Sequence, residues 1–276
     1  QHGTRRAPLS LLQEQLLTHR YTDFHRDTFP EAGSFLPEPE LFHLGPDTYL
    51  KHLRKVREAV KVPVIASLNG LTTSSWVEHA VLIEQAGASA IELNMFTIGA
   101  DPGERSSDLE TRAVELLRAV KARVKIPIAV KLSPFYSSLS NVASQLDRAG
   151  AAGLVLFNRL FQPELDIEAL EVRRVLHLSD SSELPLRLRW LGVLSSQVGC
   201  SLACSGGVHT VADAVKALMT GADAVQVVSL LLRKGPGELA TLKAGLVKWL
   251  EEHESASLGQ LRGSMNYETC PDPAAY

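Results

Sequence analysis

The sequence predicts an α/β fold of the TIM (β/α)8-barrel type, in which parallel strands alternate with helices. Three observations lead to this prediction. Short β-branched or apolar runs alternate with longer amphipathic stretches from Asp47 onward. A two-strand phrase returns after about 63 positions, so that VKVPVIASLNG is echoed by VKIPIAVKLSP and QAGASAIELN by RAGAAGLVLFN. Each apolar run is also followed by a polar side chain, at the strand end where such folds carry their active sites.

The composition indicates one large domain and argues against nucleic-acid binding and membrane-spanning segments. A chain of 276 residues with 45% hydrophobic content can bury the core of one large domain. A formal net charge of −3 without a basic stripe predicts no nucleic-acid partner. No apolar stretch reaches membrane-spanning length, so we expect no membrane segment. The three cysteines, Cys200, Cys204 and Cys270, lack the spacing of a metal site or a disulfide framework, which is typical of a cytoplasmic protein.

Residues 1–46 form an atypical amino-terminal segment, and we place the barrel domain at residues 47–276. Ser10–Thr18 carries leucines at helical spacing behind a serine that can cap a helix, which predicts one short helix. Residues 30–46 are rich in proline and glycine, which indicates a long surface loop. Loops of that length in compact domains are usually lids or binding loops.

Five helices are predicted in the barrel domain. Each has apolar side chains at helical spacing, and glycine in an AGA or TGA turn ends several of them before the next strand. In chain order they are Asp47–Val60, Ser75–Ala86, Asp108–Arg123, Leu139–Ala149 and Thr210–Thr220.

Six buried strands are predicted between these helices, because each run is short, apolar and closed by a polar or turn residue. In chain order they are Val64–Leu68, Ala90–Asn94, the stretch Ile126–Pro134, Gly153–Phe157, Ser201–Cys204 and Ala224–Val228. A closed barrel needs eight strands. The first two are either hidden in the amino-terminal segment or absent, and we favour a chain that lacks them. The open edges would then need cover from the terminal segment or from a second copy in a homodimer.

Lys131 stands near the carboxyl end of an otherwise apolar strand. A buried ammonium needs a partner or a chemical role, unless the side chain reaches past the strand end into water. Glu92 lies on the same strand face as Asn94, since alternate residues point the same way, and we expect it to pair with a charge inside the barrel. Asn69 and Asn158 close two further strands and place amides at the same edge.

The loop Ser205-Gly206-Gly207-Val208-His209 follows a buried strand and precedes a predicted helix. Two adjacent glycines let backbone N–H groups approach an anion, and a helix amino terminus adds a favourable dipole. The next strand ends at Val228 and Ser229. These two loops are the usual phosphate site of such barrels, although a tight turn would also explain the glycine pair.

The order and spacing of several motifs resemble the dihydroorotate dehydrogenases, specifically the class 1 enzymes and their dihydroorotate-dehydrogenase-like FMN flavoproteins. The motifs are HLGPDTYL (43–50), IASLNG (65–70), IELN (91–94), VKLSP (130–134), LVLFN (154–158), SGGVHTVADAVKAL (205–218) and ADAVQVVSLLLRKGP (222–236). The resemblance implies a barrel that binds FMN and a small-molecule substrate. It implies oxidation of dihydroorotate, or a related dihydropyrimidine, to orotate by hydride transfer to flavin, a step of pyrimidine (UMP) biosynthesis.

The resemblance also assigns roles to residues. Lys131 corresponds to the lysine that lies against the flavin ring, where a fixed cation favours the reduced flavin. Asn94 and Asn158 correspond to amides that hold flavin and substrate, and Asn69 is a further substrate-binding candidate. The remaining FMN-binding candidates are Ser205, Gly206, Gly207, Val228 and Ser229.

Three positions depart from the family pattern. Thr97 stands where the family has a cysteine or serine base, and we retain it as the catalytic candidate that relays a proton. Gly99 replaces a substrate-binding asparagine. Arg159 replaces a small hydroxyl residue after Asn158, where it either clamps a carboxylate or lies on the surface.

Two other classes of function remain open. In an aldolase-type barrel, Lys131 would be a Schiff-base nucleophile and no flavin would be needed. In a non-catalytic relative, the barrel would bind flavin or phosphate without turning over a substrate.

Overall fold

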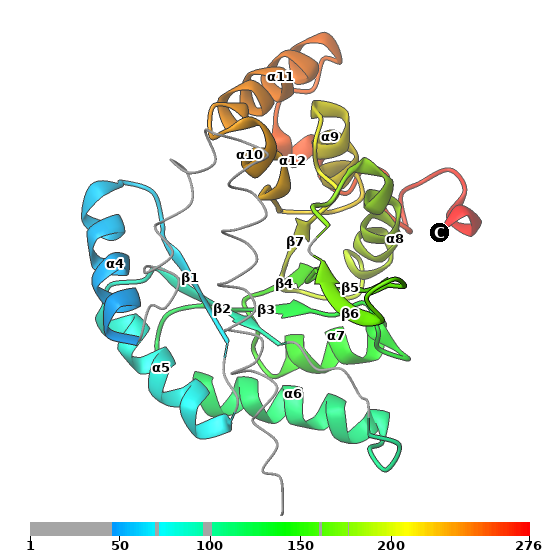
Figure 1. Ribbon diagram of the computed structural model, residues 1–276. Coiled ribbons are helices and arrows are strands. Elements are labelled where there is room, and N and C mark those ends of the chain that lie inside the picture. The colour runs from blue at the N-terminus through cyan, green and yellow to red at the C-terminus, as the bar shows by residue number, and fades with distance from the viewer. Residues whose placement is uncertain (1–45, 70–71, 96–100, 160–161, 176) are drawn as a thin grey trace, which may run out of the picture.

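The computed structural model describes residues 46–69, 72–95, 101–159, 162–175 and 177–276. Its centre is a curled sheet of six parallel strands that is covered on its outer face by helices (Figure 1). From one edge to the other, the strands are β1 (Ile65–Leu68), β2 (Ala90–Asn94), β3 (Ile128–Leu132), β4 (Gly153–Leu156), β7 (Ser201–Ser205) and β8 (Ala224–Gln226). All six predicted strands and their parallel arrangement are confirmed, and the sheet has the form of a half barrel.

The five helices predicted for the barrel domain are also present, with ends shifted by one or two residues. They are α4 (Pro46–Ala59), α5 (Thr73–Gln85), α6 (Ser106–Lys121), α7 (Leu139–Arg148) and α9 (Val211–Met219). The glycine of each AGA or TGA turn has positive φ, with +91° at Gly87, +92° at Gly150 and +116° at Gly221. This backbone conformation stops each helix and lets the chain enter the next strand at once.

Several elements had no counterpart in the sequence analysis. An antiparallel hairpin of β5 (Gln162–Asp166) and β6 (Glu171–Val175) follows β4 and forms a separate two-stranded sheet. It leads through the short helix η1 (Ser181–Glu183) into α8 (Leu184–Leu194). After β8 the chain continues through α10 (Ser229–Lys234), α11 (Glu238–Glu252), α12 (Leu258–Leu261) and η2 (Pro273–Ala275). The predicted helix Ser10–Thr18 and the loop before residue 46 lie outside the described residues.

The two faces of the sheet differ in polarity. Side chains that point outward to the helices are apolar and fully buried, such as Ile91 and Leu93 of β2 and Val130 and Leu132 of β3. Strand β4 is buried throughout, as predicted, whereas buried and half-buried residues alternate along β3. The inner face of the sheet is therefore free to carry polar groups while the outer face provides the hydrophobic core.

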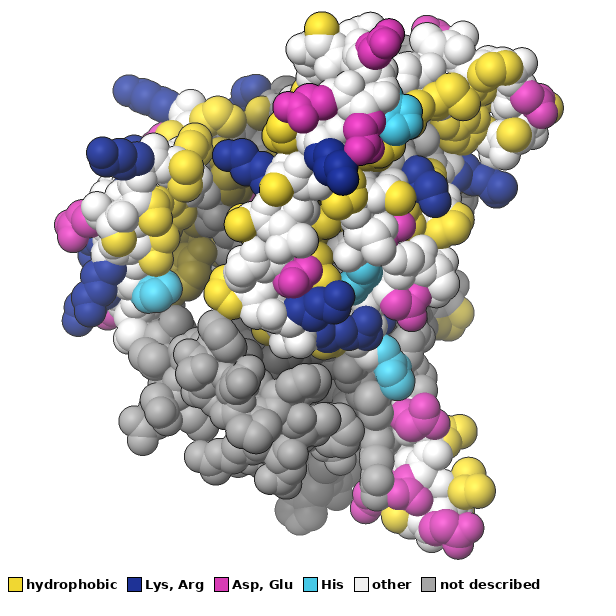
Figure 2. Space-filling model, turned by 90° about the horizontal axis from the view of Figure 1, so that it is seen from above, with side chains coloured by type: hydrophobic (Ala, Val, Ile, Leu, Met, Phe, Trp, Pro, Cys, Tyr) yellow, Lys and Arg dark blue, Asp and Glu magenta, His cyan; other side chains and the backbone are white. Residues whose placement is uncertain are grey.

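The surface shows no separation of charge on the face seen in Figure 2, where Lys and Arg side chains are mixed with Asp and Glu. None of the helices in the described part of the chain is long and apolar enough to cross a membrane.

Because β4 lies in the middle of the sheet, its outward side chains should dominate stability. Replacing the fully buried Leu154 with alanine is expected to lower the free energy of unfolding by about 2–5 kcal/mol, since it removes buried methyl groups and leaves a cavity. The matched control is Leu239→Ala on α11, where the side chain is 54% exposed and little change is expected. Urea denaturation followed by circular dichroism measures both. Equal shifts of the two midpoints would contradict this account of the core.

Candidate functional site

The parallel arrangement brings the polar residues predicted at the strand ends to one edge of the sheet. Asn94 at the end of β2 is the register partner of Lys131 in β3. Asn158 follows β4, and its backbone N–H donates to the carbonyl of Leu132 at 2.8 Å. The side chains of Asn94 and Asn158 meet directly, with Nδ2 of Asn158 donating to Oδ1 of Asn94 at 2.5 Å. The structure thus brings together three residues that lie far apart in the sequence.

Lys131 is held by a polar network on the inner face of the sheet. Its Nζ lies 3.5 Å from Oε1 of Glu92 and donates to Oε1 of Gln226 at 3.2 Å. Gln226 donates in turn to Oε2 of Glu92 at 2.7 Å, and the Ser67 hydroxyl donates to Oε1 of Glu92 at 3.0 Å. Both carboxylate oxygens of the buried Glu92 therefore have partners, as a buried charge requires. The predicted pairing of Glu92 with a charge inside the sheet is confirmed.

The hydrogen bonds of this network also show that the sheet is curved. Strand β8, which carries Gln226, is three positions from β3 and four from β2 in the strand order. In a flat sheet those separations would be roughly 14–19 Å at a strand spacing of about 4.8 Å. The observed hydrogen bonds require the sheet to curl until its inner faces meet. Gln226 was missed by the sequence analysis, although its place in the apolar run Ala224–Val228 marked it as an inward-facing polar residue.

The amide pair has a defined orientation. Oδ1 of Asn158 accepts a hydrogen bond from the backbone N–H of Arg159 at 2.9 Å, so the amide of Asn158 is fixed by its own backbone as well as by Asn94. Each amide has an NH2 group that donates and a carbonyl oxygen that accepts. Each of these groups can form more than one hydrogen bond. Such a pair can bind the edge of a planar ring that presents alternating carbonyl and N–H groups.

The predicted glycine loop follows β7 and has the backbone conformation that requires glycine. Gly206 has φ +85° and Gly207 has φ +81°. A Cβ atom on Gly207 would lie 2.7 Å from the backbone nitrogen of Leu184, and one on Gly206 would lie 3.0 Å from Nη2 of Arg187. Among the described residues, no acceptor binds the N–H of Gly207 or Val208. These two groups can therefore donate to an anion.

The amino terminus of α9, by contrast, is occupied by a carboxylate from its own first turn. Oδ2 of Asp213 accepts hydrogen bonds from the N–H groups of His209 (3.0 Å) and Thr210 (2.9 Å) and from the Ser181 hydroxyl (2.7 Å). Burial by itself would raise the pKa of Asp213, but these hydrogen bonds outweigh it and lower the pKa below its usual value. The helix dipole expected to favour a phosphate is thus already satisfied by Asp213, and the glycine backbone provides the free donors.

The loops after β7 and β8 are joined by residues that precede α8. The Ser229 hydroxyl, at the start of α10, accepts the N–H of Ser179 at 3.0 Å, and the Ser179 hydroxyl lies 3.1 Å from Nε2 of His209. Burial, reinforced by the nearby Arg233, lowers the pKa of His209, so its neutral form is favoured. Val228 is exposed beside this junction. The two loops predicted as a phosphate site are therefore neighbours.

Arg187 of α8 supports the glycine loop and was not identified from the sequence. Its Nε donates to the carbonyl of Ser205 at 3.0 Å and its Nη1 to the carbonyl of Glu183 at 2.8 Å. Burial lowers the pKa of its guanidinium below the ordinary arginine value. The alternation of Arg187 with apolar residues in LPLRLRW was a weak signal of a buried cation.

Among the described residues, Asn69 has no hydrogen bond to this cluster. Asn69 follows β1 and is exposed. Thr97 and Gly99 lie outside the described residues. Cys200 and Cys204 flank the core of β7, and burial raises the pKa of each thiol to about 12, which leaves both protonated and unreactive.

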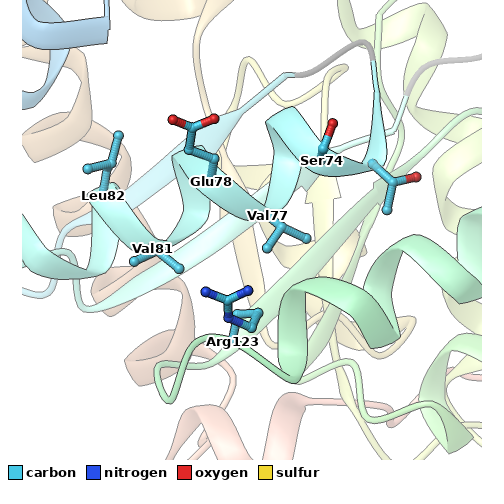
Figure 3. A pocket seen from close by; sticks show the side chains of 7 residues that line it. Ser74, Val77, Glu78, Val81, Leu82 and Arg123 are labelled. Carbon is cyan, nitrogen blue, oxygen red and sulfur yellow. The ribbon is translucent and has the colours of Figure 1, made fainter.

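A groove of ≈ 420 Å³ lies on the outer, helical side of the sheet (Figure 3). Val77, Val81 and Leu82 of α5 line it, together with the charged Glu78 and Arg123. No candidate site residue lines this groove, so it is separate from the polar edge described above.

The chain was compared with known proteins. A family model described as dihydroorotate dehydrogenase matches residues 36–250. A protein of Aeropyrum pernix with the provisional name dihydroorotate dehydrogenase A (fumarate) is 30% identical over 247 residues, which cover 85% of this chain and 78% of the relative. The catalytic subunit of dihydroorotate dehydrogenase B (NAD(+)) from Shouchella clausii is 31% identical over 209 residues, covering 73% of this chain and 68% of the relative.

The same catalytic subunit from Endomicrobium trichonymphae is 28% identical over 255 residues, covering 85% of this chain and 78% of the relative. The match extends over most of the chain and includes every strand of the curled sheet. The chain therefore belongs to the dihydroorotate dehydrogenase family, whose members are FMN-binding oxidoreductases that act on CH–CH groups.

Proposed function

We propose that this chain oxidises dihydroorotate, or a related dihydropyrimidine, to orotate or its analogue by hydride transfer to FMN. The observation that carries the proposal is the position of Lys131, which is held by Glu92 and Gln226 at the edge where Asn94 and Asn158 meet. FMN would supply the two-electron acceptor for this oxidation. The relatives named as dihydroorotate dehydrogenases support the substrate class.

The residues of the site fit FMN. The positive φ values and the close packing of Gly206 and Gly207 exclude side chains from the loop and leave N–H groups for a phosphate. We assign Ser205, Gly206 and Gly207 to the phosphate, together with Val228 and Ser229 of the neighbouring loop. Lys131 provides a fixed cation on the ring side of the site.

The amides and the lysine have different roles in the proposed reaction. Asn94 and Asn158 orient the planar rings through paired donors and acceptors, and Asn69 lies at the same edge of the sheet for further contact with the substrate. Lys131 stabilises negative charge that develops next to it, because its ammonium is already oriented and needs no reorganisation. Thr97 is the candidate for relaying the proton that leaves the substrate.

We also propose that residues 47–276 form a barrel domain of the TIM (β/α)8 type, to which the described residues contribute six strands. Strands β1 and β8 are at the two ends of the strand order, and Ile65 of β1 is 59% exposed among the described residues. Two additional strands between these edges would close the barrel. Cover from a second copy in a homodimer is the other arrangement that would protect them.

The geometry around Lys131 favours the flavin reaction over an aldolase mechanism. A Schiff-base lysine must be neutral to attack a carbonyl group. Here Nζ is occupied by two side chains instead, the Glu92 carboxylate at 3.5 Å and Oε1 of Gln226 at 3.2 Å. A fixed positive charge suits the stabilisation of an electron-rich ring and does not suit nucleophilic attack.

The first test is spectroscopic. We expect the purified chain to bind FMN and the flavin absorbance to bleach when dihydroorotate is added without air. Bound flavin that stays yellow with dihydroorotate and with uncharged dihydropyrimidines would instead identify a non-catalytic relative. Covalent trapping of a carbonyl substrate by borohydride at Lys131 would overturn the flavin proposal in favour of the aldolase.

The role of Lys131 predicts a kinetic effect. Lys131→Met is expected to slow flavin reduction on the order of 100-fold, because the oriented cation next to the developing charge is lost. The matched control is Lys248→Met on α11, which also removes a lysine paired with a glutamate but at a side chain that is 74% exposed. Stopped-flow reduction measures both rates. If both variants reduce flavin at the wild-type rate, Lys131 is not the charge that the reaction uses.

The glycine loop predicts an effect on cofactor affinity. Gly207→Ala is expected to weaken FMN binding and to lower the free energy of unfolding by about 1–3 kcal/mol, since its Cβ would press on Leu184 at positive φ. Gly237→Ala is the control, because nothing lies within 4 Å of its added Cβ. Titration with FMN, followed by flavin fluorescence, measures the affinity. Unchanged FMN affinity in a destabilised Gly207→Ala protein would remove this loop from the cofactor site.

A further inference from the structure

Arg159 lies directly beside the amide pair of the candidate site. It follows Asn158, and its backbone N–H donates to the Asn158 side chain at 2.9 Å. Its guanidinium forms an ion pair through Nη1 with Oε1 of Glu183, at the start of α8. The Arg159 side chain is 29% exposed, so it is not closed off from solvent.

Glu183 is shared between two guanidinium groups. Its second oxygen, Oε2, lies 3.5 Å from Nη2 of Arg187, and Arg187 also donates to the Glu183 carbonyl. Two arginines and one glutamate leave this half-buried cluster with one positive charge in excess. Positive charge in a partly desolvated position attracts an anion more strongly than the same charge in water does.

The hydrogen-bonding capacity of Arg159 is not fully used. Within the described part of the chain, its Nε is buried and has no partner. A buried donor without an acceptor is unfavourable, because it has lost its hydrogen bond to water. A modest rotation of the guanidinium that brings Nε to an external acceptor would recover part of that free energy. The planar fork of arginine matches the two oxygens of a carboxylate, which a lysine ammonium does not.

We propose that Arg159 is a specificity-determining residue that binds an anionic ring substituent of the substrate, a carboxylate, while Glu183 retains its contact with Arg187. This inference rests on the proposed function, because it places the ring of the substrate at Asn94 and Asn158. The excess charge of the cluster is neutralised when the carboxylate binds, and Nε gains an acceptor. A ligand with the same ring but no carboxylate neither neutralises this charge nor gives Nε an acceptor.

The test compares two ligands that share a ring. Orotate carries a carboxylate and uracil does not, so the ratio of their dissociation constants isolates the charged group. Isothermal titration calorimetry of the FMN-loaded chain is expected to show that Arg159→Gln weakens orotate on the order of 10-fold to 100-fold and leaves uracil unchanged. Arg159→Lys should restore only part of the loss, since it returns the charge without the fork.

Arg189→Gln provides the matched control, because Arg189 is an exposed arginine on α8 and should leave both affinities unchanged. An equal loss of orotate and uracil binding in Arg159→Gln would mean a structural role and overturn the inference. A ratio of the orotate and uracil dissociation constants that is the same in Arg159→Gln as in the wild type would also overturn it. The same holds if the wild-type chain binds no orotate. A selective loss of FMN would assign Arg159 to the cofactor instead.

The same experiments separate this inference from the proposed reaction. If orotate binding depends on Arg159 but dihydroorotate never bleaches the flavin, the proposed reaction fails and the anion site stands. If the flavin bleaches and Arg159→Gln leaves the orotate-to-uracil ratio unchanged, the reaction stands and the inference fails. A chain that binds no FMN can be titrated with the two ligands directly, with the same expected ratio.

Discussion

The ion pair between Glu92 and Lys131 is the interaction on which the inner face of the sheet depends. Two charges in a partly buried position are stable only if both are paired and hydrogen-bonded, and here Ser67 and Gln226 complete the set. The four residues come from β1, β2, β3 and β8, so the pair can be satisfied only when the sheet is curled. Curvature and charge compensation are thus two aspects of one arrangement.

The position of Lys131 follows from this arrangement. Its ammonium is held from two sides, by a carboxylate and by an amide oxygen. A cation that is fixed in this way can act on a neighbouring ring without first losing side-chain entropy. The outer face of the same strand is an uninterrupted part of the hydrophobic core, with Val130 and Leu132 fully buried. The packing of the outer face against the helices therefore holds the strand that positions Lys131 on the inner face.

A second centre of organisation lies where α8 meets β4 and β7. Arg187 holds the carbonyl of Ser205, and Glu183 links Arg187 to Arg159. This connects the glycine loop, which is the candidate for holding a phosphate, to the residue next to the amide pair. Asp213 meanwhile satisfies the amino terminus of α9, whereas the N–H groups of Gly207 and Val208 have no acceptor within the described part of the chain. Arg159 and the glycine loop are therefore parts of one connected cluster.

The parallel α/β class, the six strands and five of the helices could be predicted from the sequence, because hydrophobic periodicity and glycine stops are local properties of the chain. The residues at the strand ends could also be predicted, since Asn94 and Asn158 each close a recognisable apolar run and Lys131 stands near the end of another. The sequence did not indicate the β5–β6 hairpin or α8, whose segment mixes charges with apolar residues and has no clear period.

Which of these residues meet depends on the tertiary structure. The partners of Lys131 are 39 and 95 positions away, and those of Asn158 and Arg159 are 64 and 24 positions away. Such contacts depend on the curl of the sheet and on the path of the chain between strands, and no local pattern encodes either of them. The hydrogen bond between Ser181 and Asp213 at the start of α9 likewise depends on the fold, because the two residues are 32 positions apart in the sequence. Local periodicity specifies the elements, whereas long-range packing specifies the site.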